Sequence, residues 1–209
     1  MKLVPFNISY LKRFKGSGGV GTYAVQFAKK KGAFVAATST QEDMLKELGV
    51  DKVINYKEVN WWELEEFQKN PFDTIIDVRG TSFYKASTNK VIKSRKDGGV
   101  FVAVTGDDPS PTLKTFSAVF SFFSKLLWRP LWTRSGFWRT TYPTCTPFVC
   151  IPDKPMLTEY FRELDELKIE TVFDPSGPFR LTSEGVKKAF NLIESHHTHG
   201  RVVFQIAKN

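Results

Sequence analysis

The sequence predicts an α/β protein with one doubly wound, mostly parallel sheet in a single domain. Apolar segments rich in β-branched residues alternate along the chain with segments of helical period. This alternation is the layout of a parallel sheet covered by helices. With 209 residues, of which 41% are hydrophobic, the chain is long enough for one well-buried core. No internal repeat or low-complexity linker divides it.

The first expected element, a strand before residue 16, has an unusual composition. Residues 10–15 read "YLKRFK", whereas a central parallel strand is covered on both faces and is apolar. Burying Lys12 and Arg13 without partners costs on the order of several kcal/mol each. Either "FNISYL" (6–11) forms the strand and a longer basic turn follows it, or the first strand is irregular. In such a turn Lys12, Arg13 and Lys15 are solvated charges or phosphate contacts.

The first helix follows directly from a glycine-rich turn. Val20, Ala24, Phe27 and Ala28 recur at helical spacing. The lysines at 29–31 suit the negative end of the helix dipole, and the glycine after them can end the helix.

The remaining elements alternate in the same way. The strand at 33–38 is followed by a helix that begins at Ser39, which has capping-box spacing with Glu42, and ends at Gly49. Further strands are expected at 52–56, 72–78, 99–104 and 146–151, with a last strand at 201–207. Further helices are expected at 61–68, 82–93, 155–168 and 183–195.

Composition narrows the classes of function. Two cysteines, Cys145 and Cys150, are too few for a disulfide scaffold or a four-cysteine zinc site, so a reducing compartment is expected. The formal net charge of +8 suits nucleic acid, an anionic membrane surface or phosphorylated ligands. Solvated basic surfaces are the more frequent explanation, so charge alone selects no partner. Neither a membrane-spanning run nor a secretory signal is expected.

The glycine turn carries the strongest chemical motif. Gly16, Gly18 and Gly21 fit G-x-G-x-x-G at the start of the first helix. Glycines let the backbone approach a diphosphate, whose charge is met by free N–H groups at the helix N-terminus. For the motif alone, a glycine-rich turn without a ligand is the alternative. In its strand-to-helix context the motif predicts a bound dinucleotide.

The end of the second strand favours NADP(H) over NAD(H). A cofactor without a 2′-phosphate usually meets an Asp or Glu about twenty residues after the glycines, but residues 38–40 are the uncharged "TST", which tolerates a phosphate. Lys46 and Lys57 are candidate counter-charges, whereas the acidic pair at 42–43 works against the preference. Tyr56 packs on the adenine or reaches the 2′-phosphate, or else it covers the core.

Five blocks in fixed order resemble the zinc-independent medium-chain dehydrogenase/reductases. They read "GSGGVGTYAVQFAKKKGAFVAATST", "LGVDKVINYKE", "FDTIIDVRG", "GGVFVAVTG" and "HTHGRVVFQIA". The similarity runs from about residue 16 to the end. It is greatest to the quinone-oxidoreductase-like branch, which includes chloroplast-envelope quinone oxidoreductase homologues and reticulon-4-interacting proteins. The resemblance implies a Rossmann fold, bound NADP(H) and, in an active member, hydride transfer to an electron-poor alkene or quinone. It implies no metal and no assigned catalytic residue.

The resemblance also implies which residues contact the cofactor. They are Ser17, Gly18, Gly19 and Val20 around the diphosphate, Ser39 and Tyr56 at the phosphorylated ribose, and Val78 and Thr105 beside the ribose and nicotinamide. Each could equally be structural. Arg201 matches a basic position in the family's last block, where it approaches the cofactor or faces solvent.

The chain departs from the family before the turn. Relatives place a GroES-like substrate domain there, which supplies most of the substrate pocket, whereas only fifteen residues precede the turn here. We therefore expect an irregular lead-in at 1–15 and a cofactor domain at 16–209 that includes a C-terminal remnant of the substrate domain. A half-built cleft should slow hydride transfer severely.

Residues 109–152 form an aromatic and basic segment without Asp or Glu. Three uses remain open: family-type packing over the cleft and between subunits, docking onto a membrane-associated assembly, and binding of nucleic acid or another acidic partner. No nucleic-acid motif supports the last use, and we expect no nucleic acid.

Two functions follow from these observations. The first is the NADP(H)-binding domain of a quinone or enone reductase. The second is a non-catalytic subunit that keeps the fold and docks through 109–152 in a larger membrane complex, with the chloroplast and the mitochondrion as candidate compartments. His196, His197 and His199 are interpreted as a surface helix end rather than metal ligands.

Overall fold

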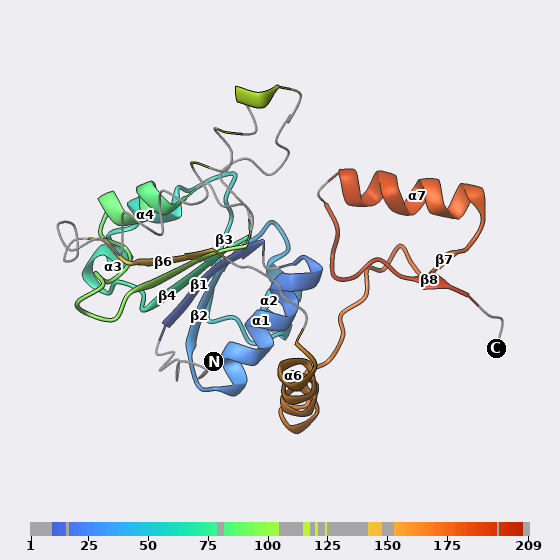
Figure 1. The fold of residues 1–209 in the computed structure, drawn as a ribbon, viewed down its shortest axis with the longest axis horizontal. Coiled ribbons are helices and arrows are strands. Elements are labelled where there is room, and N and C mark those ends of the chain that lie inside the picture. Colours follow the sequence, from blue (N-terminus) through green and yellow to red (C-terminus); the bar gives the residue numbers. More distant parts are fainter. Residues whose placement is uncertain are drawn as a thin grey trace.

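The structure, a computed structural model, describes residues 10–15, 17–78, 82–104, 115–117, 120, 124, 142–147, 153–195 and 197–206. Its central element is a six-stranded parallel sheet in the order β3-β2-β1-β4-β5-β6. The strands are β1 (Tyr10–Lys15), β2 (Phe34–Thr38), β3 (Lys52–Ile54), β4 (Thr74–Asp77), β5 (Val100–Ala103) and β6 (Thr144–Pro147). The chain winds outward in both directions from β1 (Figure 1). The predicted doubly wound α/β fold is confirmed.

Helices cover the two faces of this sheet (Figure 1). The helices against the sheet are α1 (Gly19–Lys30), α2 (Glu42–Glu47), the 3-10 helix η1 (Trp61–Glu63), α3 (Glu65–Lys69) and α4 (Phe83–Thr88). Two further helices, α6 (Lys154–Glu166) and α7 (Ser183–Glu194), follow β6 in the chain. A cluster that includes Val25 and Leu45 packs α1 and α2 on one face. A second cluster, which includes Trp61, Phe83 and Phe101, packs η1, α3 and α4 on the other. Residues of β2 belong to both clusters, because alternate residues of a strand face opposite sides.

β1 consists of the charged segment itself. It pairs in parallel with β2 and β4, and Lys12 lies opposite Ala36 on one side and Ile75 on the other. The register with β2 shifts between Lys12 and Lys15. The irregular strand is therefore the alternative that the structure confirms, because main-chain pairing with two neighbours satisfies the backbone whatever the side chains are. Residues 1–9 lie outside the described residues.

The buried face of α1 differs from the expected one. Val20 was expected on the apolar stripe, but it is 54% exposed. The buried residues are Gly21, Thr22, Val25, Gln26 and Ala28. Two of these are polar, and they are buried because hydrogen bonds satisfy them: the Thr22 hydroxyl donates to the Gly19 carbonyl, and the Gln26 amide bonds to the backbone of Glu170.

Two helices are shorter than expected. α2 has no capping box: its N-cap is Gln41, and the Ser39 hydroxyl accepts from the Gln41 N–H at 2.9 Å instead of capping the helix. α4 stops before residue 90, because Lys90 adopts a left-handed conformation with φ of 55°. The chain beyond Lys90 then pairs with Phe72 through an isolated parallel bridge to Ile92.

Beyond β6 the described chain leaves the sheet. α6 lies beside α1, and Lys31 pairs with Glu163 at 2.5 Å. α7, β7 (Phe179–Arg180) and β8 (Phe204–Gln205) stand apart from the six-stranded sheet (Figure 1). β8 pairs with β7 and is shorter than the expected strand at 201–207. α6 has no buried residue, and α7 buries only Ala189.

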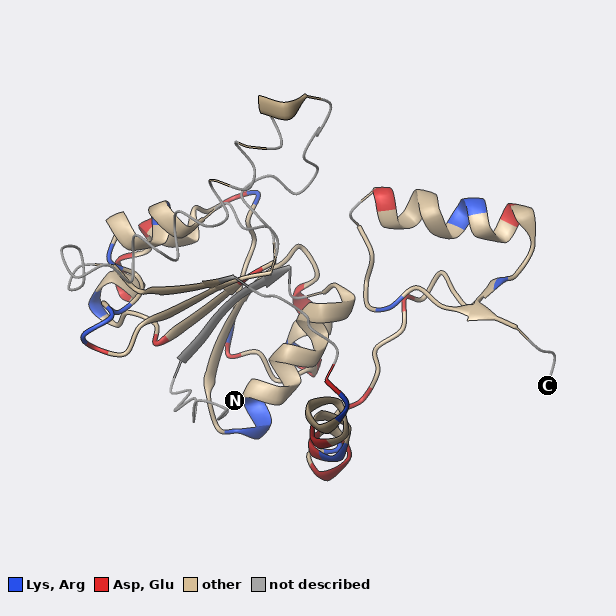
Figure 2. Ribbon diagram, in the orientation of Figure 1, with Lys and Arg blue, Asp and Glu red and all other residues tan. Residues whose placement is uncertain are grey.

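Charges of both signs occur on the described surface, including both α6 and α7 (Figure 2). None of the helices within the described ranges is long and apolar enough to cross a bilayer. Most of the aromatic and basic segment at 109–152 lies outside the described residues, so its proposed docking role remains a prediction.

Candidate nucleotide site

The glycine turn leads from β1 into α1. Gly18 is the N-cap, with an extended backbone (φ −85°, ψ 166°), and the first turn of the helix contains no acidic residue. The Thr22 N–H donates to the Gly18 carbonyl at 3.0 Å. The three amides between these residues have no acceptor within the helix, and together with the helix dipole they favour an anion. Gly16, the first glycine of the motif, lies outside the described residues.

The other expected contact residues follow the carboxyl ends of neighbouring strands. Ser39 comes directly after β2, Tyr56 lies just beyond β3 and Val78 directly follows β4. Tyr56 is 38% exposed, whereas Val78 is half-buried and packs against the α1-side cluster. Thr105, the remaining expected contact, lies outside the described residues. Because parallel strands end at one edge of the sheet, these residues surround the place where the strand order reverses.

Ser17 and Ser39 join two of these strand ends. Both are buried, at 4% and 2% exposure. The Ser39 hydroxyl donates to Ser17 Oγ at 3.2 Å, and the Ser39 N–H donates to the Ile54 carbonyl at 3.0 Å. The expected ribose contact is therefore also a structural link that fixes the glycine turn relative to β2 and β3.

A second segment, which sequence reasoning did not place, lies against the same turn. Gly18 and Gly200 form an isolated parallel bridge, and the Gly200 N–H donates to the Ser17 carbonyl at 2.6 Å. The Arg201 guanidinium stacks over the Tyr23 ring at 4.5 Å. A Cβ atom on Gly19 would lie 3.1 Å from Arg201 Cγ, so the first turn of α1 and Arg201 are in contact. The only sequence signal for this contact was the family resemblance of the last block.

The network around Tyr23 reaches α6. Tyr23 hydrogen-bonds to Thr171, and Tyr160 of α6 lies close to Tyr23 and Arg201. Burial raises the pKa of Tyr160 and so does the neighbouring Tyr23, whereas the Arg201 charge acts in the opposite direction. This corner places a cation and two phenols near the mouth of α1.

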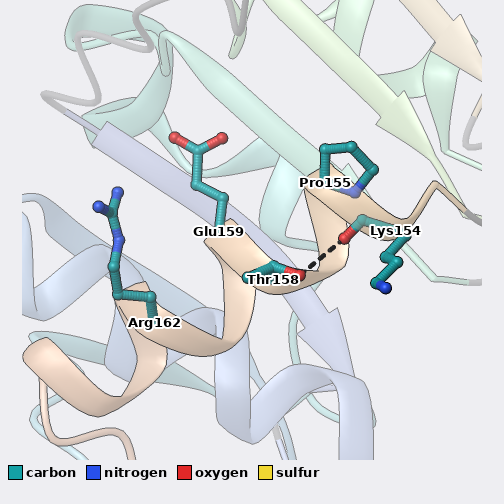
Figure 3. Close-up of a pocket in the computed structure, with 5 residues that line it drawn as sticks. All are labelled: Lys154, Pro155, Thr158, Glu159 and Arg162. Atoms are coloured by element: carbon teal, nitrogen blue, oxygen red, sulfur yellow. Dashed lines mark hydrogen bonds between the residues drawn. The ribbon is translucent and has the colours of Figure 1, made fainter.

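A depression on the described surface lies elsewhere, on α6. It has a volume of about 440 Å³ and is lined by residues of α6 (Figure 3). These are Lys154, Pro155, Thr158, Glu159 and Arg162. Because one exposed helix supplies them and no residue of the glycine turn is among them, we assign it no role in nucleotide binding.

The described residues contain no group of three or more His, Cys, Asp and Glu side chains that could hold a metal ion. His197 is exposed and His199 half-buried, whereas His196 and Cys150 lie outside the described residues.

Comparisons with known proteins identify the family of this chain. The model of the zinc-binding dehydrogenase family matches residues 19–149. The chain is 28% identical over 192 residues to 2-methylene-furan-3-one reductase of Solanum lycopersicum, which covers 90% of this chain and 38% of that protein. It is 29% identical over 203 residues to the mitochondrial NAD(P)H oxidoreductase RTN4IP1 of Bos taurus, covering 91% and 46%. It is 29% identical over 192 residues to the chloroplastic quinone-oxidoreductase homolog of Spinacia oleracea, covering 90% and 50%.

Solved structures share the fold. The quinone oxidoreductase of Coxiella burnetii superimposes with a TM-score of 0.60 at 25% identity, covering 96% of this chain and 53% of that chain. The Escherichia coli quinone oxidoreductase complexed with NADPH superimposes with a TM-score of 0.64 at 20% identity, covering 96% and 59%. The chain thus spans about half the length, or less, of the curated relatives it matches. On the family match and the shared Rossmann-like fold, this chain belongs to the zinc-binding dehydrogenase family, in which its relatives include quinone and enone oxidoreductases.

Proposed function

We propose that this chain binds NADP(H) at the carboxyl edge of the sheet, as the cofactor domain of a quinone or enone reductase. The observation that carries the proposal is the glycine turn at the mouth of α1, where unpaired helix amides face a strand-order reversal and a cation stands beside them. The nicotinamide supplies the hydride for an electron-poor alkene or quinone. The protein residues hold the diphosphate, orient the ribose and cover one wall of the nicotinamide.

The preference for NADP(H) rests on the end of β2. Thr40 is exposed next to the buried Ser39, and neither repels a 2′-phosphate. Lys46 is a weaker counter-charge than expected, because it pairs with Glu42 at 2.7 Å, and the hydrogen bond and charge of Glu42 raise the pKa of Lys46. Lys57 is exposed and has no ion-pair partner among the described residues, so it is the counter-charge we favour.

Titration with NADPH and NADH tests both parts of the proposal. Thr40→Asp places a carboxylate at an exposed position in the "TST" stretch, and it should weaken NADPH binding about tenfold or more while changing NADH binding little. Thr88→Asp, at an exposed position at the end of α4, is the matched control. A folded wild-type protein that binds neither dinucleotide would refute the proposed function. Equal weakening of NADPH and NADH binding by Thr40→Asp would refute only the NADP preference.

We further propose that α7, β7 and β8 are the C-terminal remnant of the substrate domain. They form a unit with its own two-stranded sheet. Large apolar side chains on and around this unit are exposed, including Phe173, Leu181, Phe190, Ile193 and Ile206. Exposed apolar surface of this kind is normally covered by another part of a protein.

The same exposed surface favours one alternative, a non-catalytic subunit that docks in a larger assembly. The two functions differ in a simple assay. NADPH oxidation with simple quinones by the isolated chain, at rates like those of complete reductases, would remove the alternative. Dinucleotide binding without turnover, together with recovery of a stable partner complex, would favour it. An organellar location remains a prediction, supported by the mitochondrial and chloroplastic names of two relatives.

A further inference from the structure

One buried carboxylate holds the segment that lies against the glycine turn. Asp174 is 2% exposed. Its two oxygens accept hydrogen bonds from the backbone, Oδ2 from the His199 N–H at 2.7 Å and Oδ1 from the Ser176 N–H at 2.9 Å. Burial by itself raises a carboxyl pKa, but these amide hydrogen bonds hold the pKa of Asp174 below its usual range. The group is therefore ionised at neutral pH.

The backbone around Asp174 is paired with the same segment. The Asp174 N–H donates to the Arg201 carbonyl at 2.9 Å, and the Arg201 N–H donates to the Val172 carbonyl at 2.8 Å. Gly200 has a φ of +105°, and a Cβ at this position would lie 2.5 Å from the Val172 oxygen. Residues 199–201 are thus held on one side by Asp174 and its neighbours, and on the other by the Gly200–Ser17 hydrogen bond.

The Arg201 side chain is left available by this arrangement. Its guanidinium stacks on Tyr23, and it has no carboxylate partner among the described residues. Arg201 is exposed, and a cation beside unpaired helix amides adds to their attraction for a diphosphate. Asp174 bonds to the backbone of the segment and not to the guanidinium, so it can fix the position of Arg201 without neutralising it.

We propose that Asp174 is a positioning residue for dinucleotide binding. Its carboxylate fixes residues 199–201 so that Arg201 stands over the first turn of α1, where it meets the cofactor diphosphate. The inference rests on the proposed nucleotide site and adds to it a residue far from the glycine motif in sequence. A merely structural role would lower stability without selectively changing contacts to the diphosphate.

A double-mutant cycle separates these roles. NADPH and 2′-AMP are titrated calorimetrically into the wild type, Asp174→Asn, Arg201→Gln and the double variant. Asp174→Asn keeps the side-chain volume but has only one acceptor oxygen for the two amides. We expect it to weaken NADPH binding about tenfold, as a displaced charged contact would. The double variant should bind NADPH no more weakly than Arg201→Gln. Binding of 2′-AMP, which lacks the diphosphate, should stay unchanged. Asp165→Asn, at an exposed position on α6, is the matched control.

The outcomes distinguish the inference from the proposed function. A wild type that binds no NADPH overturns both. If the wild type and Asp174→Asn bind NADPH equally well, the inference alone is overturned. It is also overturned if the losses of the two single variants add in the double variant, or if Asp174→Asn weakens 2′-AMP binding as much as NADPH binding. If circular dichroism shows that Asp174→Asn does not fold, Gly200→Ala carries the same test. The added Cβ would lie 2.5 Å from the Val172 oxygen and displaces the segment while the Asp174 side chain is kept. This variant must give the same NADPH-specific, non-additive loss.

Discussion

The contact between Gln26 and Glu170 provides a sharp test of how the C-terminal part is held on the sheet. The Gln26 Nε2 donates to the Glu170 carbonyl at 2.9 Å, and its Oε1 accepts from the Glu170 N–H at 3.0 Å. A side chain of α1 thus pairs with a backbone 144 residues away. Gln26→Met removes both bonds to Glu170, and a third within α1 from Nε2 to the Thr22 carbonyl at 3.2 Å, while keeping an unbranched side chain of similar size and helix propensity.

The expected effect follows from the two bonds to Glu170. A hydrogen bond contributes about 1 kcal/mol net, so their loss should favour local opening by about 2 kcal/mol. That is about a 30-fold change in the opening equilibrium. The buried clusters beneath α1 and α4 do not include Gln26, so we expect the sheet to keep most of its stability.

Hydrogen exchange measured by NMR tests this expectation. The Glu170 amide should lose about 30-fold protection in Gln26→Met, because its acceptor is gone. Amides within β2 and β4 should keep theirs. Tryptophan fluorescence in urea, to which the buried Trp61 contributes, monitors global unfolding, and the midpoint of the transition should move little. Gln68→Met, at an exposed position on α3, is the control.

Two results would refute this reasoning. Unchanged protection at Glu170 would mean that the Gln26 bonds do not hold the segment. A large fall in the urea midpoint, with protection lost equally across the sheet, would mean that the C-terminal part and the sheet unfold as one unit.

Three further substitutions test the core and its charges. The hydrogen bond from Lys29 and the backbone hydrogen bond from Val35 hold the pKa of Asp51 below its usual range, against the effect of burial. In urea titrations, the wild type should be more stable than Asp51→Asn. The full difference in the free energy of unfolding should be present above pH ~4, and it should vanish as the pH falls through the lower pKa of the folded state. An advantage that persists at the lowest pH would contradict this. Asp77→Ala should cost about 2 kcal/mol by urea unfolding, because the buried carboxylate accepts from the N–H and hydroxyl of Ser82, and a neutral result would contradict it. Phe101→Ala should cost about 3 to 5 kcal/mol in the same assay because its ring is fully buried, and a loss under 1 kcal/mol would show that the site collapses around the cavity.

Local patterns predicted the elements of the fold well, and their faces and ends less well. The alternation of strands and helices and the glycine turn at α1 are local signals, and the described structure confirms them. The exposed Val20 and the buried Gln26 were not predicted, because a helical period reports apolar spacing and cannot show that a distant backbone will satisfy a polar side chain. The end of α4 before Lys90 was missed because the pairing of the following residues with Phe72 is also nonlocal.

The candidate site shows the same difference between what could be predicted from the sequence and what depends on tertiary contacts. The expected contact residues at the strand ends were named from the family resemblance, and segments that follow parallel strands lie at the carboxyl edge of the sheet. The burial of Ser39 against Ser17, the position of Arg201 beside Gly19, and the hydrogen bond from His199 to Asp174 depend on contacts between segments that only the folded chain brings together.

The amino-acid order by itself determined that this protein has a doubly wound sheet with a glycine turn at the start of the first helix, because periodicity and turn chemistry act over a few residues. Tertiary structure alone decided which polar groups are buried, and which segment lies against that turn. The free energy of those contacts comes from partners as much as 183 residues apart, such as Ser17 and Gly200, whose proximity no local pattern encodes.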